Sequence, residues 1–171
     1  YFCGYRSAAW NSEYEYPAMM LVARSGKIAL VTSTRRFHGA LATACVEETE
    51  ILAFDGFGEQ ATPGVFAPSI VQALQQLGVT SGKLGTETGL VARMRITYSD
   101  YQALFALMPD MQAMDFAKYI FDLREIKSPR EIEVMRKCCA MSVDAFKVGM
   151  DKLVLGSTTE EEMYHEYVAA C

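Results

Sequence analysis

Lys127-Ser128-Pro129-Arg130-Glu131-Ile132-Glu133-Val134-Met135-Arg136 contains a complete helix-start signal. The Ser128 hydroxyl is placed to accept a hydrogen bond from the Glu131 amide, and Glu131 occupies the reciprocal position of a capping box. Pro129 falls in the first helical turn, where its missing N–H costs nothing. A helix is therefore predicted to begin at Ser128, and this stretch marks a joint between two parts of the chain.

An α/β domain is predicted before the joint, over residues 1–123. Apolar runs at 18–23 and 27–32 flank the turn residues Arg24-Ser25-Gly26 and predict a β-hairpin. Apolar periodicity predicts helices over 35–45, 65–77 and 97–108, the last with Ser99 as N-cap, and strands over 49–54, 83–87 and 111–116. Alternating strands and helices indicate an α/β fold, a mixed sheet flanked by helices.

Two helices are predicted after the joint, over residues 128–171. The first carries an apolar stripe made of Ile132, Met135, Cys139, Val143 and Phe146. The second begins near Gly156-Ser157-Thr158-Thr159, with acidic side chains at its positive end. Two helices alone cannot bury such a stripe, so we predict that it is partly exposed in this chain or covered by another one.

The composition limits the classes of partner. The chain has 171 residues, is 51% apolar and carries a net charge of −5, with 16 scattered Lys and Arg, so no nucleic acid is expected. No apolar run approaches the ~20 residues of a membrane span. Five cysteines without Cys-x-x-Cys spacing are interpreted as reduced side chains. We therefore expect a globular, cytoplasmic protein that binds no membrane.

Two groups of residues invite a functional interpretation. His165 follows Glu161 and Glu162 at helical spacing, as in a partial metal site, but a metal needs further ligands from other elements. We interpret this group as a solvated helix face. His38 beside Arg35 and Arg36 is an anion-site candidate that we interpret as exposed residues. No phosphate-binding glycine fingerprint and no Gly-x-Ser-x-Gly elbow occurs.

The segment Tyr5–Tyr14 is the strongest binding candidate, because it places the only Trp and an Arg in a loop before the hairpin. Arg6 is able to pair with a carboxylate, and Trp10 offers an aromatic surface. The alternative is that the aromatic side chains of this segment pack on the hairpin.

Four segments together resemble one enzyme family. They are Leu123–Arg136, Tyr1-Phe2-Cys3-Gly4-Tyr5, Gly85-Thr86-Glu87 and Gly156–Met163. Their order and spacing resemble the creatinase, prolidase and Xaa-Pro aminopeptidase family, the "pita-bread" metallopeptidases. The resemblance implies a creatinase/prolidase-type N-terminal domain, ribonuclease H-like and lacking its first helix and strand, followed by the first two helices of a truncated catalytic domain.

The resemblance also implies where the chemistry lies. The family's catalytic domain supplies two Asp, one His and two Glu to two divalent metal ions, Mn, Co or Zn, and these ligands come after Cys171, so no catalytic or metal residue is carried over to this chain. In a homodimer of the family, the loop after the Gly-Tyr segment projects toward the partner's active site. Arg6 and Trp10 are therefore expected to contact substrate in trans.

The expected parent is a metal-dependent Xaa-Pro peptidase, an aminopeptidase or dipeptidase acting on short proline-containing peptides. The chain would serve dimerisation and shape the partner subunit's substrate pocket. Two alternatives stay open: a creatinase-like amidinohydrolase acting on a small amidino compound, or a lyase on the same fold; and a non-catalytic binding or dimerisation module.

Overall fold

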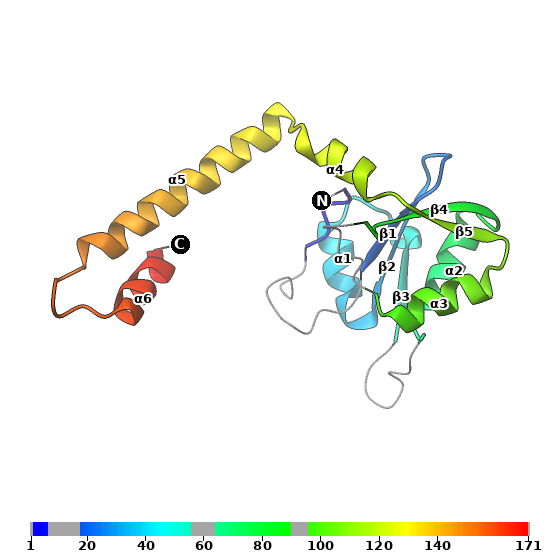
Figure 1. Ribbon diagram of the computed structural model, residues 1–171, viewed down its shortest axis with the longest axis horizontal. Helices are drawn as coiled ribbons and strands as arrows, with labels where there is room; N and C mark the ends of the chain where they lie inside the picture. The colour runs from blue at the N-terminus through cyan, green and yellow to red at the C-terminus, as the bar shows by residue number, and fades with distance from the viewer. Residues whose placement is uncertain (1, 7–17, 56–63, 90–95, 171) are drawn as a thin grey trace. The chain divides into compact units, whose positions relative to one another are not determined.

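The structure is a computed structural model that describes residues 2–6, 18–55, 64–89 and 96–170 (Figure 1). The chain divides into two compact units, residues 1–118 and 119–171. The division falls inside helix α4 (Ala117–Glu125). The predicted domain limits at 123 and 128 stay a prediction, and each unit is described by itself.

The first unit contains a three-stranded sheet in the order β1-β2-β3, made of β1 (Met19–Val22), β2 (Ile28–Ser33) and β3 (Ile51–Phe54). β1 and β2 are antiparallel, with Met19 opposite Val31, and they form the predicted hairpin. β2 and β3 are parallel, with Leu30 opposite Ile51. Gly26 turns the hairpin at φ +87°, a conformation that favours glycine. The sheet is therefore mixed, as predicted.

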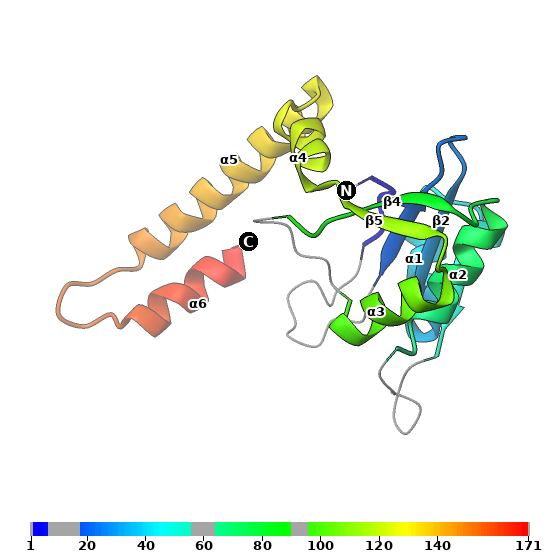
Figure 2. The ribbon, with the colours of Figure 1, turned by 45° about the vertical axis from the view of Figure 1, so that its right-hand side comes forward.

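A second, two-stranded sheet pairs β4 (Gly82–Thr86) with β5 (Met111–Asp115) in parallel, as Figure 2 shows. Gly82 lies opposite Met111, and Thr86 lies opposite Asp115. The two strands need the intervening helix α3 (Tyr98–Leu107) as a crossover, because parallel neighbours cannot be joined by a tight turn. The predicted strands are confirmed, and they fall into two sheets.

The larger core lies between the first sheet and the helices α2 (Ala67–Gln76) and α3. Ala29 and Val31 of β2 point into it, together with Phe66 and Ile70. A smaller core lies on the other side of β2. There Leu30 packs with Ala40 of α1 (Phe37–Thr43), Ile51 of β3 and Cys3 of the N-terminal segment. Successive side chains of β2 point to opposite faces of the sheet, and nearly all of them are buried, so both faces of the strand are covered.

The N-cap of α3 is Thr97, so the predicted cap at Ser99 is wrong. The Thr97 hydroxyl oxygen accepts a hydrogen bond from the Asp100 amide at 3.0 Å. The same hydroxyl donates to Asp100 Oδ2 at 2.6 Å. Thr97 is the N-cap because the carboxyl group of Asp100, three residues later, fixes its side chain. Ser99 already lies within the first turn of the helix.

Helix α4 was not predicted. It follows β5, and the Ala117 amide at its start donates to Asp115 Oδ1 at 2.9 Å. Its large apolar side chains Tyr119, Phe121 and Leu123 are all exposed. The helix has only nine residues and begins two residues after β5, so its short apolar pattern was not separated from that of the strand.

The second unit contains α5 (Pro129–Asp151) and α6 (Glu160–Ala170), and α6 folds back along α5 (Figure 1). The capping box at the start of α5 is confirmed: Glu131 N donates to Ser128 Oγ at 3.3 Å, and Ser128 N donates to Glu131 Oε2 at 2.8 Å. None of the helices in the described part of the chain is long and apolar enough to cross a membrane.

The apolar stripe of α5 is exposed, as predicted. Met135, Val143 and Phe146 keep 48%, 53% and 52% of their surface exposed. Helix α6 packs instead on a neighbouring face of α5, where Ala145 and Gly149 are buried. A Cβ atom added at Gly149 would lie 3.3 Å from the Met163 carbonyl oxygen, so the absence of a side chain permits this close approach.

Candidate substrate-binding segment

The N-terminal segment Cys3–Arg6 is held at the end of helix α1 by two hydrogen bonds and a close approach of the backbone. The buried Cys3 accepts a hydrogen bond at its carbonyl from the Cys45 amide at 2.7 Å. Gly4 adopts φ +71°, and a Cβ atom there would lie 3.3 Å from the Thr43 carbonyl oxygen. The Arg6 amide donates to Thr43 Oγ1 at 3.0 Å. The backbone that leads to Arg6 therefore has a defined path.

Arg6 itself is exposed, at the end of this anchored segment. A guanidinium group on the surface can bind a carboxylate through two parallel hydrogen bonds. Trp10, the second predicted binding residue, lies outside the described residues. Because the structure describes only one of the two side chains, whether they act together stays a prediction.

Thr43, the last residue of α1, supports this segment and was not found from the sequence. Its hydroxyl donates to the Gly39 carbonyl at 2.7 Å, one helical turn earlier, and accepts from Arg6. A threonine in the last turn of a helix was the only available signal, and bonding to the preceding turn is common for such residues. The partner, 37 positions away in sequence, could not be read from that signal.

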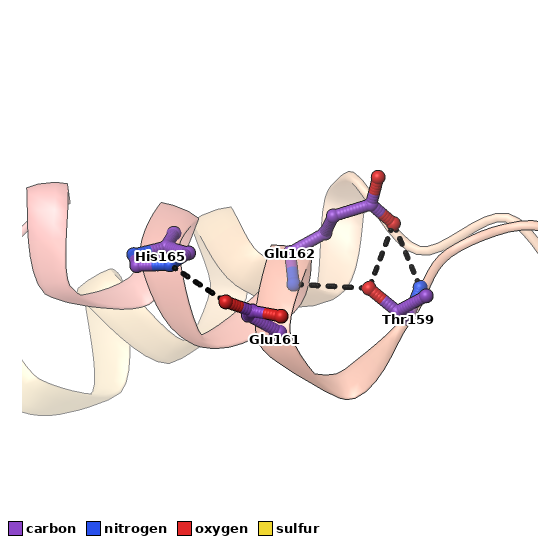
Figure 3. Close-up of polar contacts among 4 residues, drawn as sticks. All are labelled: Thr159, Glu161, Glu162 and His165. Carbon is purple, nitrogen blue, oxygen red and sulfur yellow. Dashed lines mark hydrogen bonds and ion pairs between the residues drawn. The ribbon is translucent and has the colours of Figure 1, made fainter.

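The group of His165, Glu161 and Glu162 is a solvated helix face, as interpreted (Figure 3). His165 Nε2 lies 3.7 Å from Glu161 Oε1, and these side chains are 70% and 83% exposed. Glu162 is engaged elsewhere, because its Oε2 accepts from the Thr159 amide at 2.8 Å and from the Thr159 hydroxyl at 3.0 Å. The three side chains therefore do not converge on one point.

Helix capping perturbs the pKa of the Glu162 carboxyl group. The backbone hydrogen bond from Thr159, and then the hydroxyl hydrogen bond from the same residue, lower the pKa of Glu162 below the usual 4.5. Both bonds stabilise the ionised form. The shift is therefore explained by helix capping and needs no ligand.

Across residues 2–6, 18–55, 64–89 and 96–170, no three His, Cys, Asp or Glu side chains stand close enough to hold a metal ion. These residues do not fit the two-metal site that the family resemblance implies for an intact enzyme.

The anion-site candidate lies largely on the surface. Arg35 and His38 lie on the surface, and Arg36 is half-buried. The His38 ring meets Phe37 edge-on, with ring centroids 5.5 Å apart. Arg35 and Arg36 belong to a 3-10 turn, Thr34–Arg36, that precedes α1. The interpretation of this group as exposed residues is confirmed for Arg35 and His38, whereas Arg36 is half-buried.

The cysteines that the structure describes are free: Cys3 is buried, and Cys45, Cys138 and Cys139 are exposed. Cys138 and Cys139 lie within the long helix α5, where adjacent side chains point in different directions. Both side chains therefore lie on the helix surface and not at a turn.

The features described so far define an α/β domain with a helical extension, in which an anchored N-terminal segment presents an arginine. Residues 1–126 match the model of the creatinase/prolidase N-terminal domain, and the chain belongs to this family. Among curated proteins, none matches the sequence.

A solved structure with a similar fold is that of the X-Pro aminopeptidase from Thermotoga maritima MSB8. It superposes with a TM-score of 0.70 at 16% sequence identity. The likeness covers 99% of this chain and 40% of that chain, so the present chain spans less than half the length of that protein. The match supports the predicted fold, an α/β domain of the creatinase/prolidase type.

Proposed function

We propose that this chain is the N-terminal part of a metal-dependent Xaa-Pro peptidase-like hydrolase. The family match over residues 1–126 carries the proposal. The fold shared with an X-Pro aminopeptidase over 99% of the chain supports it, and so does the continuation of that likeness through α5 and α6. In this proposal α5 and α6 are the first two helices of the pita-bread catalytic domain.

The role proposed for the chain itself is dimerisation and the shaping of the partner subunit's substrate pocket. Arg6 and Trp10 would contact the substrate in trans, with Arg6 pairing with the carboxylate of a short peptide that contains proline. The exposure of Arg6 and the anchoring of its backbone on Thr43 support this role, since a binding side chain must be both reachable and held in place.

Two divalent metal ions, Mn, Co or Zn, are proposed for the intact protein, with ligands from outside the described residues, which form no metal site. A bound metal ion supplies a water molecule activated for attack at neutral pH. We also propose a cytoplasmic location, because the described cysteines are free and reduced thiols are typical of that compartment.

A first experiment separates this proposal from its alternatives. The coding sequence that continues beyond Cys171 is read for the series Asp, Asp, His, Glu, Glu. Its absence refutes the metallopeptidase and leaves the creatinase-like or module alternatives. Where the series is present, the full-length protein is assayed on Xaa-Pro dipeptides and tripeptides with added manganese. Release of the residue before proline is expected, and an elimination product instead of hydrolysis would identify a lyase.

A second experiment tests the contact in trans. Arg6→Met is expected to raise the KM of the full-length enzyme for a peptide with a free C-terminal carboxylate, and to leave the KM for the same peptide with an amidated C-terminus unchanged. Arg6→Lys, which keeps the charge, is the matched variant and should raise the KM less.

Mixed dimers show which subunit supplies Arg6. Arg6→Met subunits are combined with subunits that carry Arg6 but lack one metal ligand. In these dimers every competent active site belongs to an Arg6→Met subunit. A normal KM then means that the partner provides Arg6, and a raised KM would contradict the proposed role in trans.

A further inference from the structure

We infer that Thr43 is a positioning residue for Arg6, fixing the backbone from which this side chain reaches substrate. The inference rests on the proposed function, in which Arg6 contacts the substrate. It goes further by naming a residue on a different element, the last turn of α1, that determines where the arginine stands. Thr43 does not itself touch substrate in this scheme.

The direction of the hydrogen bonds is determined by the chemistry of a hydroxyl. The Thr43 hydroxyl has one proton, and it donates that proton to the Gly39 carbonyl at 2.7 Å. Its lone pairs therefore face outward from the helix, and one of them accepts the Arg6 amide at 3.0 Å. The hydrogen bond to Gly39 fixes the orientation of the Thr43 hydroxyl independently of Arg6, so the acceptor for the Arg6 amide is preorganised.

The contact restrains Arg6 without holding the fold together. Cys3, three residues earlier, is anchored independently, because its side chain is 5% exposed in the smaller core and its carbonyl binds the Cys45 amide. The hydrogen bond between Arg6 and Thr43, by contrast, is exposed to solvent. Its loss should therefore free the backbone at Arg6 and leave the packing of Cys3 unchanged.

The test compares Thr43→Val with Thr43→Ser in the full-length enzyme. Valine keeps the branched shape and removes the acceptor, whereas serine keeps the hydroxyl. We expect Thr43→Val to raise the KM for a peptide with a free carboxylate about two- to tenfold, the factor that corresponds to one net hydrogen bond, with kcat nearly unchanged. Thr43→Ser should restore most of the affinity, and the KM for the amidated peptide should not change.

A second measurement observes the hydrogen bond directly. The exchange rate of the Arg6 amide hydrogen should rise in Thr43→Val and return toward the original value in Thr43→Ser. The rate at the Cys45 amide, which belongs to the independent anchor, should stay the same. An Arg6 amide that exchanges equally fast in all three proteins would overturn the inference.

The outcomes separate this inference from the proposed function. If Arg6→Met leaves the KM unchanged, the substrate contact itself is refuted, and the functional role of Thr43 is refuted with it. If Arg6→Met raises the KM and Thr43→Val does not, only the positioning role is overturned. A Thr43→Val variant that loses kcat and thermal stability together would show a structural role instead. In the double variant, Thr43→Val should add no further increase to that of Arg6→Met.

Discussion

Asp100 joins the beginnings of two helices, and replacing it with alanine should destabilise the first unit. The residue is 4% exposed. Its Oδ1 accepts the Phe66 amide, the residue before α2, at 2.8 Å, and its Oδ2 accepts the Thr97 hydroxyl, the N-cap of α3, at 2.6 Å. A single carboxyl group thus connects segments 34 residues apart.

The expected cost follows from the two bonds. Removing the carboxyl group leaves the buried Phe66 N–H without its acceptor, which costs about 1–3 kcal/mol. Losing the hydrogen bond from Thr97 adds about 0.5–1.5 kcal/mol. Asp100→Ala should therefore reduce the free energy of unfolding by about 2–4 kcal/mol, a large part of the ~5–15 kcal/mol typical of a domain.

Urea unfolding followed by circular dichroism measures this difference. Ser99→Ala is the matched control: the residue is adjacent and exposed, and the structure gives it no capping role. It should change the free energy of unfolding by less than about 0.5 kcal/mol. The slope of free energy against urea must stay the same for the midpoints to be compared. A cost below about 1 kcal/mol for Asp100→Ala, or equal costs for both variants, would refute the reasoning.

Three further predictions concern other parts of the chain. Gly85→Ala should lower the unfolding midpoint, because the new Cβ would lie 2.9 Å from Cγ of Phe116; an unchanged midpoint would contradict this contact, and Phe116→Ala should recover part of the loss. The capping contribution of Glu162 should be complete above pH 4.5 and be lost as the pH falls through its lowered folded-state pKa; carbon NMR should give a midpoint below 4.5, and Glu162→Gln should reduce the pH dependence of α6 helicity, with the remainder due to Glu160 and Glu161. Phe146→Lys on the exposed stripe of α5, where Phe146 is 52% exposed, should reduce the binding of an apolar dye at constant helix content; dye binding at the original level would argue against the stripe as its site.

Elements determined by local chemistry were predicted well from the sequence. The hairpin of β1 and β2 follows from two apolar runs and a turn with Gly26. The start of α5 follows from Ser128 and Glu131, which are three residues apart and bind each other. In each case the interacting residues are neighbours in the chain, so the pattern contains both partners.

Elements determined by distant contacts were predicted less well. Helix α4 is an exception, because it was missed as a helix of only nine residues although its first amide is bound by Asp115, two residues earlier. The N-cap of α3 was placed two residues too late, because Asp100, which secures Thr97, owes its buried position to the Phe66 amide. Neither apolar periodicity nor the capping preference of a residue reveals a hydrogen-bond partner that is distant in sequence.

The same distinction decides which candidate site survives. The acidic group at the start of α6 fails because a neighbour in sequence captures one of its members: Thr159 binds Glu162 and turns it away from Glu161 and His165. The segment at Arg6 persists because its partner, Thr43, lies on another element and leaves the guanidinium group exposed. A carboxylate that is oriented by a neighbour in sequence points away from a shared site, whereas an arginine held through its backbone leaves its guanidinium group exposed. Arg6 is therefore the position at which substrate binding should first be tested.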